Sequence, residues 1–372
     1  MTAIEDRSGP GAGIAGTAGT AGATGATGTA GRRAFLAAMA GAGALALASC
    51  ASDPGSGRTL SLTSALPTAV NPRTELAISI VTTELQLQAS GQLNKLPFKV
   101  SSWPNLQAGP DIIEGFRAHS IDVANNAGIP PIQAHSSGVQ AKIVAVATTN
   151  APTYQFATAP GSDVTSVAGF RGKKLAFSQG QAQGVVLLRA LKQAGIPYSA
   201  VNLVPMTSDE FLTALEARQV DVAVLAQPVT TEYIDGFGSK GARIIDTSVV
   251  DYLSILWSPA EVLEDAAKAA AIRAFIPFWA RASVWAWENP AQWIQTYYVG
   301  NQHLTTEQGE LIVKAQPKPA FPVSWAKAIA WEQETNDLLA AGGFDPKFDV
   351  SVLFDTRFEG IASAAVPAQY RE

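Results

Sequence analysis

Short apolar blocks alternate with amphipathic segments along most of the chain, and this pattern predicts strands and helices in turn. Residues 142–147 form a nearly continuous apolar run, as in a strand buried within a parallel sheet. Residues 183–194 carry apolar positions at helical spacing, and Gly195 follows as a stop signal. The same reasoning predicts strands at residues 59–63, 98–103, 121–124, 175–178, 201–205, 221–226, 242–246 and 253–257, and helices at residues 74–88, from 109, at 207–218 and from 259 onward. Such alternation is typical of mostly parallel, doubly wound sheets, so the predicted fold class is α/β.

The order of these elements predicts two lobes joined by two crossing segments. A chain of 372 residues with 47% apolar content can bury more than one core. Residues 154–158 lead into the second lobe, and the strand at 253–257 returns to the first. We therefore expect lobe I at residues 59–157 plus 253–372, and lobe II at residues 158–252.

The loop after the strand at 175–178 is predicted to bind an anion. It is rich in glycine and side-chain amides and opens a helix, whose first N–H groups lack intrahelical partners at the positive end of the dipole. An ordinary strand-to-helix turn is the alternative for this stretch on its own. The candidate residues are Ser178, Gly180, Gln181, Ala182, Gln183 and Gly184. Replacing Gln181 and Gln183 together is expected to weaken ligand binding.

The amino end looks like an export signal. Residues 1–31 form a Gly/Ala/Thr run that cannot build a core. Arg32 and Arg33 precede an apolar run too short to span a membrane, which resembles a twin-arginine signal peptide, although the general export route stays open. The run ends in Leu-Ala-Ser-Cys50, which resembles the bacterial lipobox and implies lipidation of Cys50. We expect residues 1–49 to be removed, residues 50–58 to act as a tether, and two acyl chains to anchor the protein outside the cytoplasmic membrane.

Composition narrows the chemistry. A formal net charge of −5 without a basic cluster argues against nucleic acid as a partner. Cys50 is the single cysteine, so no disulfide can form within the chain and thiol catalysis is not expected. The three histidines are scattered without metal-ligand spacing, and we expect neither a metal nor a cofactor. The tryptophans after residue 259 are expected to pack in the core.

Several segments resemble, in order, the aliphatic-sulfonate-binding proteins of ABC importers, within the wider taurine, nitrate and sulfonate group. The matching segments are residues 108–114, 120–123, 128–132, 137–138, 170–177, 187–195 and 219–224. The resemblance implies a type II periplasmic-binding-protein-like fold, with a small anionic ligand held between two lobes. It also implies an extracytoplasmic receptor, monomeric and not an enzyme, that delivers its ligand to the transmembrane subunits of a permease.

Carried over by position, the resemblance adds four groups of candidate ligand-binding residues to the loop at 178–184. They are Ser64, Ala65 and Leu66; Gly109 and Pro110; Asn125, Asn126, Ala127 and Gly128; and Gln227 and Pro228. This sequence departs from the family at residues 125–128, 181–184 and 226–229, where family members carry Ser-Thr-Gly-Asp, Ser/His and Trp-Asp-Pro-Tyr-like segments. Neutral amides and backbone N–H groups can still hold a sulfonate.

Other ligands and one other class of function stay open. Nitrate, taurine or another small organic acid are alternatives to a sulfonate, and Asp251 is the candidate partner for the ammonium group of taurine. Desulfinase-like and thiamine-pyrimidine-synthase-like enzymes resemble the same group. An enzyme would need His119, His135 or His303 in its cleft, and surface or capping roles are expected for these histidines.

Overall fold

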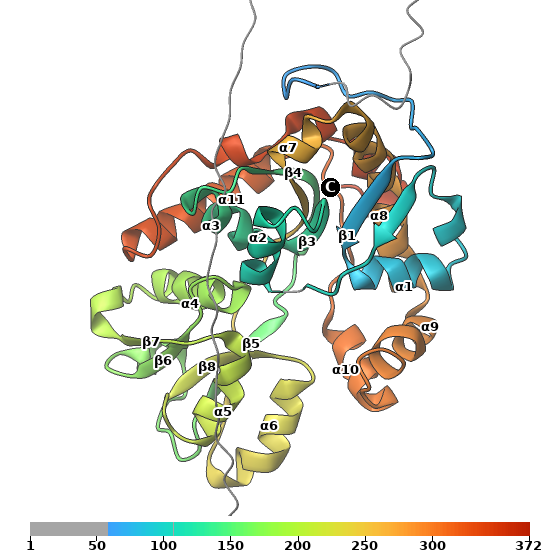
Figure 1. Cartoon of the computed structure of the whole chain (residues 1–372). Coiled ribbons are helices and arrows are strands. Elements are labelled where there is room, and N and C mark those ends of the chain that lie inside the picture. Colours follow the sequence, from blue (N-terminus) through green and yellow to red (C-terminus); the bar gives the residue numbers. More distant parts are fainter. Residues whose placement is uncertain (1–58, 107) are drawn as a thin grey trace, which may run out of the picture. The chain divides into compact units, whose positions relative to one another are not determined.

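The computed structural model describes residues 59–106 and 108–372, so the predicted export signal and Cys50 lie outside the described residues. Its strands form two five-stranded sheets with the same topology (Figure 1). The first sheet has the order β2-β1-β3-β10-β4, and its strands are β1 (Glu75–Ser79), β2 (Lys99–Ser102), β3 (Val123–Ala127), β4 (Ala141–Thr148) and β10 (Leu253–Pro259). The strands β2, β1 and β3 are parallel, whereas β10 runs antiparallel to β3 and β4.

The second sheet repeats this plan with a later part of the chain. Its order is β7-β6-β8-β5-β9, and its strands are β5 (Tyr154–Thr158), β6 (Lys174–Phe177), β7 (Asn202–Pro205), β8 (Val222–Ala226) and β9 (Ile244–Ile245). Here β5 is the strand that runs antiparallel to its neighbours. The chain passes between the sheets at residues 149–153 and 246–252, so two crossing segments join the lobes as predicted.

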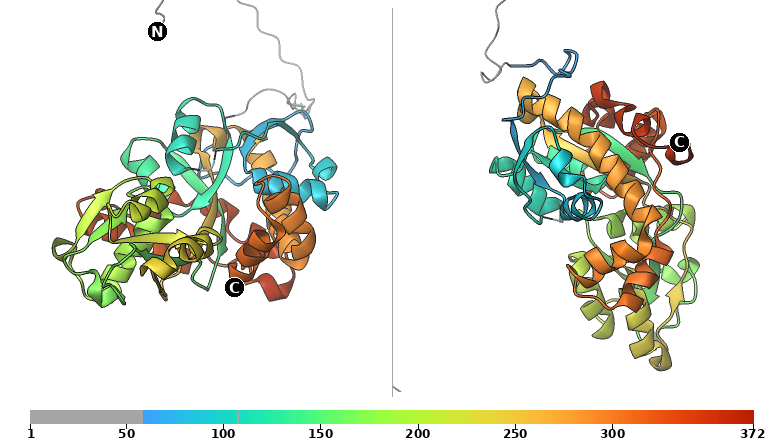
Figure 2. Two further views of the ribbon diagram at one scale, coloured as in Figure 1. Left: turned by 90° about the horizontal axis from the view of Figure 1, so that it is seen from below. Right: turned by 90° about the vertical axis from the view of Figure 1, so that its right-hand side faces the viewer.

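Helices follow the parallel strands in both lobes. Those of the first lobe are α1 (Val81–Ala89), α2 (Gly109–Arg117) and α3 (Ile129–Ser136), and those of the second are α4 (Ala182–Gln193), α5 (Phe211–Glu216) and α6 (Val229–Phe237). The carboxyl-terminal part adds α7 (Ala260–Leu263), α8 (Ala266–Glu288), α9 (Pro290–Trp293), a π-helical turn (Ile294–Val299), α10 (Thr306–Ala315), α11 (Ala326–Ala341) and α12 (Ile361–Ala364). The long α8 packs along α1 and α12 (Figure 2). No helix in the described ranges is both long and apolar enough to cross a membrane.

Helix ends are where the sequence signals proved most accurate. The predicted helix from Gly109 begins at that residue, with proline in its first turn. The Thr207 hydroxyl and the Glu210 carboxylate form a capping box, in which the Thr207 N–H donates to the Glu210 carboxylate at 2.8 Å. Asp265 caps α8 by accepting hydrogen bonds from the backbone N–H groups of Ala267 and Lys268.

The first predicted strand is wrong, and the first predicted helix is wrong over residues 74–80. Residues 59–63 form no strand, since Thr59 makes only an isolated bridge to Asp265 and a turn follows. Residues 75–79 are the strand β1 rather than a helix, because Leu76 and Ile78 are fully buried in alternation with more exposed neighbours and the strand pairs on both sides. The helix starts only at Val81.

Two further boundaries differ from expectation. Residues 125–127, expected as part of a turn, are the last residues of β3. The strand β5, whose residues were placed in lobe I up to Ala157, lies wholly in the second sheet. We therefore propose that lobe I ends within residues 149–153.

Candidate functional site

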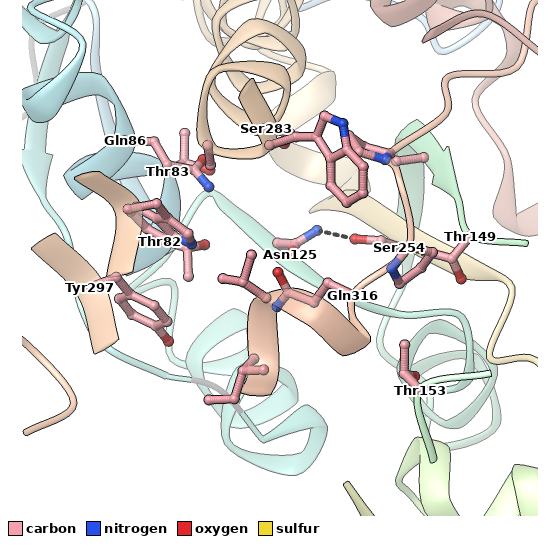
Figure 3. Close-up of a pocket in the computed structure, with 18 of the residues that line it drawn as sticks. Thr82, Thr83, Gln86, Asn125, Thr149, Thr153, Ser254, Ser283, Tyr297 and Gln316 are labelled. Atoms are coloured by element: carbon pink, nitrogen blue, oxygen red, sulfur yellow. Dashed lines mark hydrogen bonds between the residues drawn. The ribbon is translucent and has the colours of Figure 1, made fainter. Parts of the chain in front are cut away.

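A cavity of about 560 Å³ lies where the first lobe meets the crossing segments and β8. Three parts of the chain form it: the start of α1 with the end of β3, the crossing segments with the loop after β8, and the carboxyl-terminal helices from α8 to α10. The lining residues are Thr82, Thr83, Gln86, Asn125, Ala147, Thr148, Thr149, Thr153, Gln227, Ser254, Trp279, Ser283, Ala286, Trp287, Trp293, Tyr297, Tyr298, Ile312, Val313, Gln316, Pro317 and Pro319 (Figure 3).

One side of the cavity is polar and centres on Asn125. The Asn125 side-chain amide donates to the Ser254 hydroxyl at 3.2 Å and to the Ile255 carbonyl at 2.8 Å, so its NH₂ group is fixed against β10. Thr82 and Thr83 face Asn125 from the first turn of α1 (Figure 3). A smaller cavity of about 170 Å³ adjoins at the same place and shares Thr82 and Asn125.

The first turn of α1 has the features of an anion seat. Its N-cap residue, Ile80, provides no side-chain cap, and the first intrahelical bond is donated by Glu84 to the Ile80 carbonyl. The preceding N–H groups point out of the helix end, where the dipole is positive. An oxyanion at Thr82 is therefore favoured without a formal positive charge.

The other side of the cavity is aromatic. Trp287 on α8 is 37% exposed, whereas Trp279, Trp293 and Trp325 are buried as expected. The rings of Trp293 and Tyr297 are parallel within 9°, with centroids 4.8 Å apart. Burial raises the pKa of Tyr298 to about 12, so this phenol stays neutral, and it accepts a hydrogen bond from Gln316 at 2.7 Å. The described lining contains no Asp, Glu, Lys, Arg, His or Cys.

Two of the predicted site residues line this cavity, namely Asn125 and Gln227. Asn126 points to the opposite face of β3, because side chains alternate along a strand, and its Oδ1 accepts the indole N–H of the fully buried Trp257 at 2.9 Å. Ala127 follows Asn126 and Pro228 follows Gln227 in the chain, and both lie outside the lining.

The loop at residues 178–184 faces the first lobe but is not part of the cavity lining. A Cβ at Gly180 would lie 2.6 Å from the Gln133 side chain, and that side chain donates to the Gln179 carbonyl at 3.3 Å. Gln181 accepts a hydrogen bond from the Ser208 backbone N–H at 2.8 Å. A Cβ at Gly184 would overlap the Ser178 carbonyl, so this turn requires glycine.

Helix starts of the first lobe meet that loop. A Cβ at Gly109 would lie 2.7 Å from the Pro130 side chain and 3.5 Å from the Gly180 carbonyl, whereas Pro110 is exposed. A Cβ at Gly128 would overlap the Glu332 carboxylate. The structure thus brings Gly109 and the loop together at a contact between the lobes.

Ser64, Ala65 and Leu66 lie apart from the cavity lining. Their expected role depended on a strand at residues 59–63, which does not form. The Ser64 carbonyl instead accepts a hydrogen bond from Arg357 at 3.2 Å. Thr82 and Thr83 occupy the position for which these residues were chosen, since they follow the true first strand.

The site residues that sequence reasoning missed fall in two groups. Thr82, Thr83 and Gln86 were hidden because β1 was taken as part of a helix, although the alternation of Leu76 and Ile78 was a readable strand signal. Trp287 was expected in the core with the other tryptophans, and it is exposed. No local signal distinguishes it from its neighbours, because its exposure depends on where α10 lies.

A charged cluster joins the lobes behind the cavity. Arg189 on α4 is 4% exposed and donates to Glu334 and to Thr335 on α11, both at 2.7 Å. Its guanidinium also lies 3.7 Å from the Trp331 ring centroid. Burial raises the pKa of Glu332 to about 8, and burial likewise raises the pKa of Asp251 to about 7. Asp251 is not in the cavity lining.

The histidines and acidic residues give no catalytic or metal-binding arrangement in the described chain. His119, His135 and His303 are all outside the cavity lining. His119 follows α2 with a positive φ of 51° and contacts Glu261, and His135 stacks on Phe348. Within residues 59–106 and 108–372 no group of three His, Cys, Asp or Glu side chains could hold a metal ion.

Comparison with known proteins now adds to this geometry. A model of the family described as NMT1/THI5-like matches residues 109–292, which include β3, Asn125, the loop at 178–184 and α8. This matched segment is similar to the NMT1/THI5-like family. The resemblance to the sulfonate, nitrate and taurine group is therefore confirmed.

Several proteins similar to this chain are named as sulfonate-binding proteins. An aliphatic sulfonates-binding protein of Escherichia coli (strain K12) is 30% identical over 134 residues, which cover 36% of this chain and 42% of that relative. The match thus spans less than half of the relative's length. The chain also resembles the crystal structure of the periplasmic aliphatic sulphonate binding protein from Escherichia coli, with a TM-score of 0.64 and 22% identity over 77% of this chain and 99% of that one.

A second solved structure gives the same result. The alkanesulfonate-binding protein from Xanthomonas axonopodis pv. citri, bound to MOPS, has a TM-score of 0.62 and 21% identity over 82% of this chain and 100% of that one. At these identities the likeness is one of fold. The predicted two-lobe periplasmic-binding-protein-like fold is confirmed.

Proposed function

We propose that this protein is the extracytoplasmic solute-binding lipoprotein of an ABC importer, and that it captures a small organosulfonate in the 560 Å³ cavity. The observation that carries the proposal is the neutral polar wall at the first turn of α1, opposite an apolar wall. The named relatives support it, since they are known as proteins that bind aliphatic sulfonates or alkanesulfonates.

The polar wall suits a sulfonate head group. Thr82 and Thr83 can donate hydrogen bonds to the sulfonate oxygens, together with the first N–H groups of α1. The Asn125 N–H groups are already bound to Ser254 and Ile255 and hold that side chain in place in the polar wall. Bonds to an ionised acceptor are stronger than bonds between neutral groups, so no lysine or arginine is required. A sulfonate also stays ionised at every pH at which the protein is folded, which fits a wall without titratable groups.

The alternatives fit this cavity less well. Taurine carries an ammonium group, and the described lining has no carboxylate to pair with it; Asp251 lies outside the lining. Nitrate has no tail to cover the aromatic wall. An enzyme of the desulfinase type would need a nucleophile, and the described lining contains neither cysteine nor histidine.

The proposed lipid anchor and permease partner follow from the sequence and from the fold family. The Leu-Ala-Ser-Cys50 motif precedes the described residues. Labelling with a radioactive fatty acid in a bacterial host should mark the wild-type chain and leave Cys50→Ser unmarked. Equal labelling of both chains would remove the anchor from the proposal.

Titration calorimetry on the full chain tests the ligand. Ethanesulfonate, taurine, nitrate, sulfate and propionate are compared at one pH and ionic strength. We expect heat of binding for ethanesulfonate and none for propionate, whose two oxygens and planar head satisfy fewer donors. Binding of propionate or nitrate alone, without any sulfonate, would contradict the proposed function.

A further inference from the structure

The aromatic wall of the cavity exposes more apolar surface than a short alkyl tail can cover. Among the described residues, Trp287 is the one aromatic side chain among the large apolar residues that are more than a third exposed, at 37%. Trp287 is one of the residues that line the cavity, so part of its surface borders the cavity. A buried ligand tail would remove this surface from water.

The wall is flat and held in place by packing. Trp293 is 5% exposed, and its ring stacks in parallel on Tyr297 while Tyr298 packs edge-on against both rings. Tyr298 is fixed in turn by Gln316, which follows α10. A preformed planar surface favours a rigid ring over a flexible chain, since the ring loses less conformational freedom when it binds.

The size of the cavity also favours a ligand with a ring over one with a short alkyl tail. Cavities of roughly 300 to 1,000 Å³ hold drug-sized molecules, and this one measures about 560 Å³. A one- or two-carbon sulfonate with its head group at Thr82 would occupy only the polar side. Ile312, Val313 and Pro317, which line the cavity from α10 and the residues after it, would then be left without a contact.

We propose that the preferred ligand is a sulfonate with an aromatic ring as its tail, and that Trp287 determines this preference by contacting the ring. This inference rests on the proposed function and narrows it from organosulfonates in general to arenesulfonates. Trp287 contributes to the tail site alone, because the head-group donors come from α1.

Calorimetry with two probes tests the inference. Naphthalene-2-sulfonate and methanesulfonate share the head group and differ in the tail. We expect the wild-type full chain to bind naphthalene-2-sulfonate at least tenfold more tightly. Trp287→Ala should lower the affinity for naphthalene-2-sulfonate about tenfold and the affinity for methanesulfonate less than twofold. Trp287→Phe, which keeps an aromatic face, should restore most of the loss.

The controls distinguish a failure of the aromatic preference from a failure of the receptor proposal. Val323→Ala removes another exposed apolar side chain, 57% exposed and outside the cavity lining, and should change neither affinity. Equal affinity for the two probes, or an equal loss of both in Trp287→Ala, would overturn the aromatic preference while the receptor proposal stands. Absence of binding for every sulfonate would overturn the receptor proposal, and the aromatic preference with it.

Discussion

The cavity and the contact between α4 and α11 both lie near the crossing segments, but one is lined by neutral side chains and the other contains charged ones. The cavity lining has no charged side chain among the described residues, whereas the contact between α4 and α11 buries Arg189 with Glu334 beside it and Glu332 and Asp251 nearby. A cavity that must release its ligand has reason to use many weak neutral donors. A permanent contact can use buried charges, whose separation is costly. The difference suggests that the charged contact contributes to stability and the neutral cavity contributes to binding.

The largest expected effect comes from removing the cation. Arg189→Ala removes the hydrogen bond from the guanidinium to the Glu334 carboxylate. It also removes the partner of the Thr335 hydroxyl and of the Trp331 ring. Losing one member of a buried ion pair typically costs 3–5 kcal/mol, and we expect a loss of about 3 kcal/mol because Glu334 is partly exposed. Urea denaturation measures it. A loss below about 0.5 kcal/mol would show that the contact is dispensable.

The next effect is a pH dependence of stability that belongs to the charged contact. Burial raises the pKa of Glu332 to about 8, above the ordinary 4.5 of an unfolded chain. The folded state therefore holds a proton that the unfolded state releases, and Glu332 costs stability progressively as the pH rises from about 4.5 to 8. Arg189 and Asp251 face the same carboxyl group, with Arg189 acting to lower its pKa and Asp251 to raise it.

The variant Glu332→Gln isolates this effect. Its free energy of unfolding relative to wild type should increase between pH 5 and pH 8.5, by a few kcal/mol in total since one pKa unit corresponds to ~1.4 kcal/mol. Glu334→Gln is the matched control. Burial acts to raise the pKa of Glu334, but hydrogen bonds from Lys192 and Arg189 hold it below its usual range. The free energy of unfolding of Glu334→Gln relative to wild type should therefore not increase between pH 5 and pH 8.5. A flat difference for Glu332→Gln would contradict the assignment.

The cavity should respond to charge in affinity rather than in stability. Asn125→Asp keeps the shape of the side chain but places a carboxylate against the proposed sulfonate, and it removes the donor to Ser254 and Ile255. We expect the affinity for ethanesulfonate to fall at least tenfold, with a loss of about 1 kcal/mol in stability. Calorimetry and denaturation report the two quantities separately. Unchanged affinity would move the head group away from Asn125.

The sequence predicted the fold well and the site in part. The regular strand–helix alternation, the helix start at Gly109 and the capping box at Thr207 are local signals, and all are confirmed. Asn125 and Gln227, which were carried over from the family resemblance, line the cavity, and their role in binding stays a prediction. Thr82 was missed because the residues of β1 were predicted to be part of a helix. Trp287 depends on α10, which lies nearby in space but about 20 residues away in sequence, so no local pattern marks it.

The smallest expected effect concerns the loop that the sequence favoured most. Gln181 is held by the Ser208 N–H, and the loop packs on Gln133, outside the described cavity lining. The structure therefore leads to a different expectation from the sequence: Gln181→Ala with Gln183→Ala should change ethanesulfonate affinity less than twofold. The cost should be about 1 kcal/mol of stability for the lost hydrogen bond. Asn125→Asp, measured in parallel, shows that the assay detects a loss. If the double variant instead loses tenfold or more, ligand binding draws the two lobes together at this loop, and the site extends from the first turn of α1 to the first turn of α4.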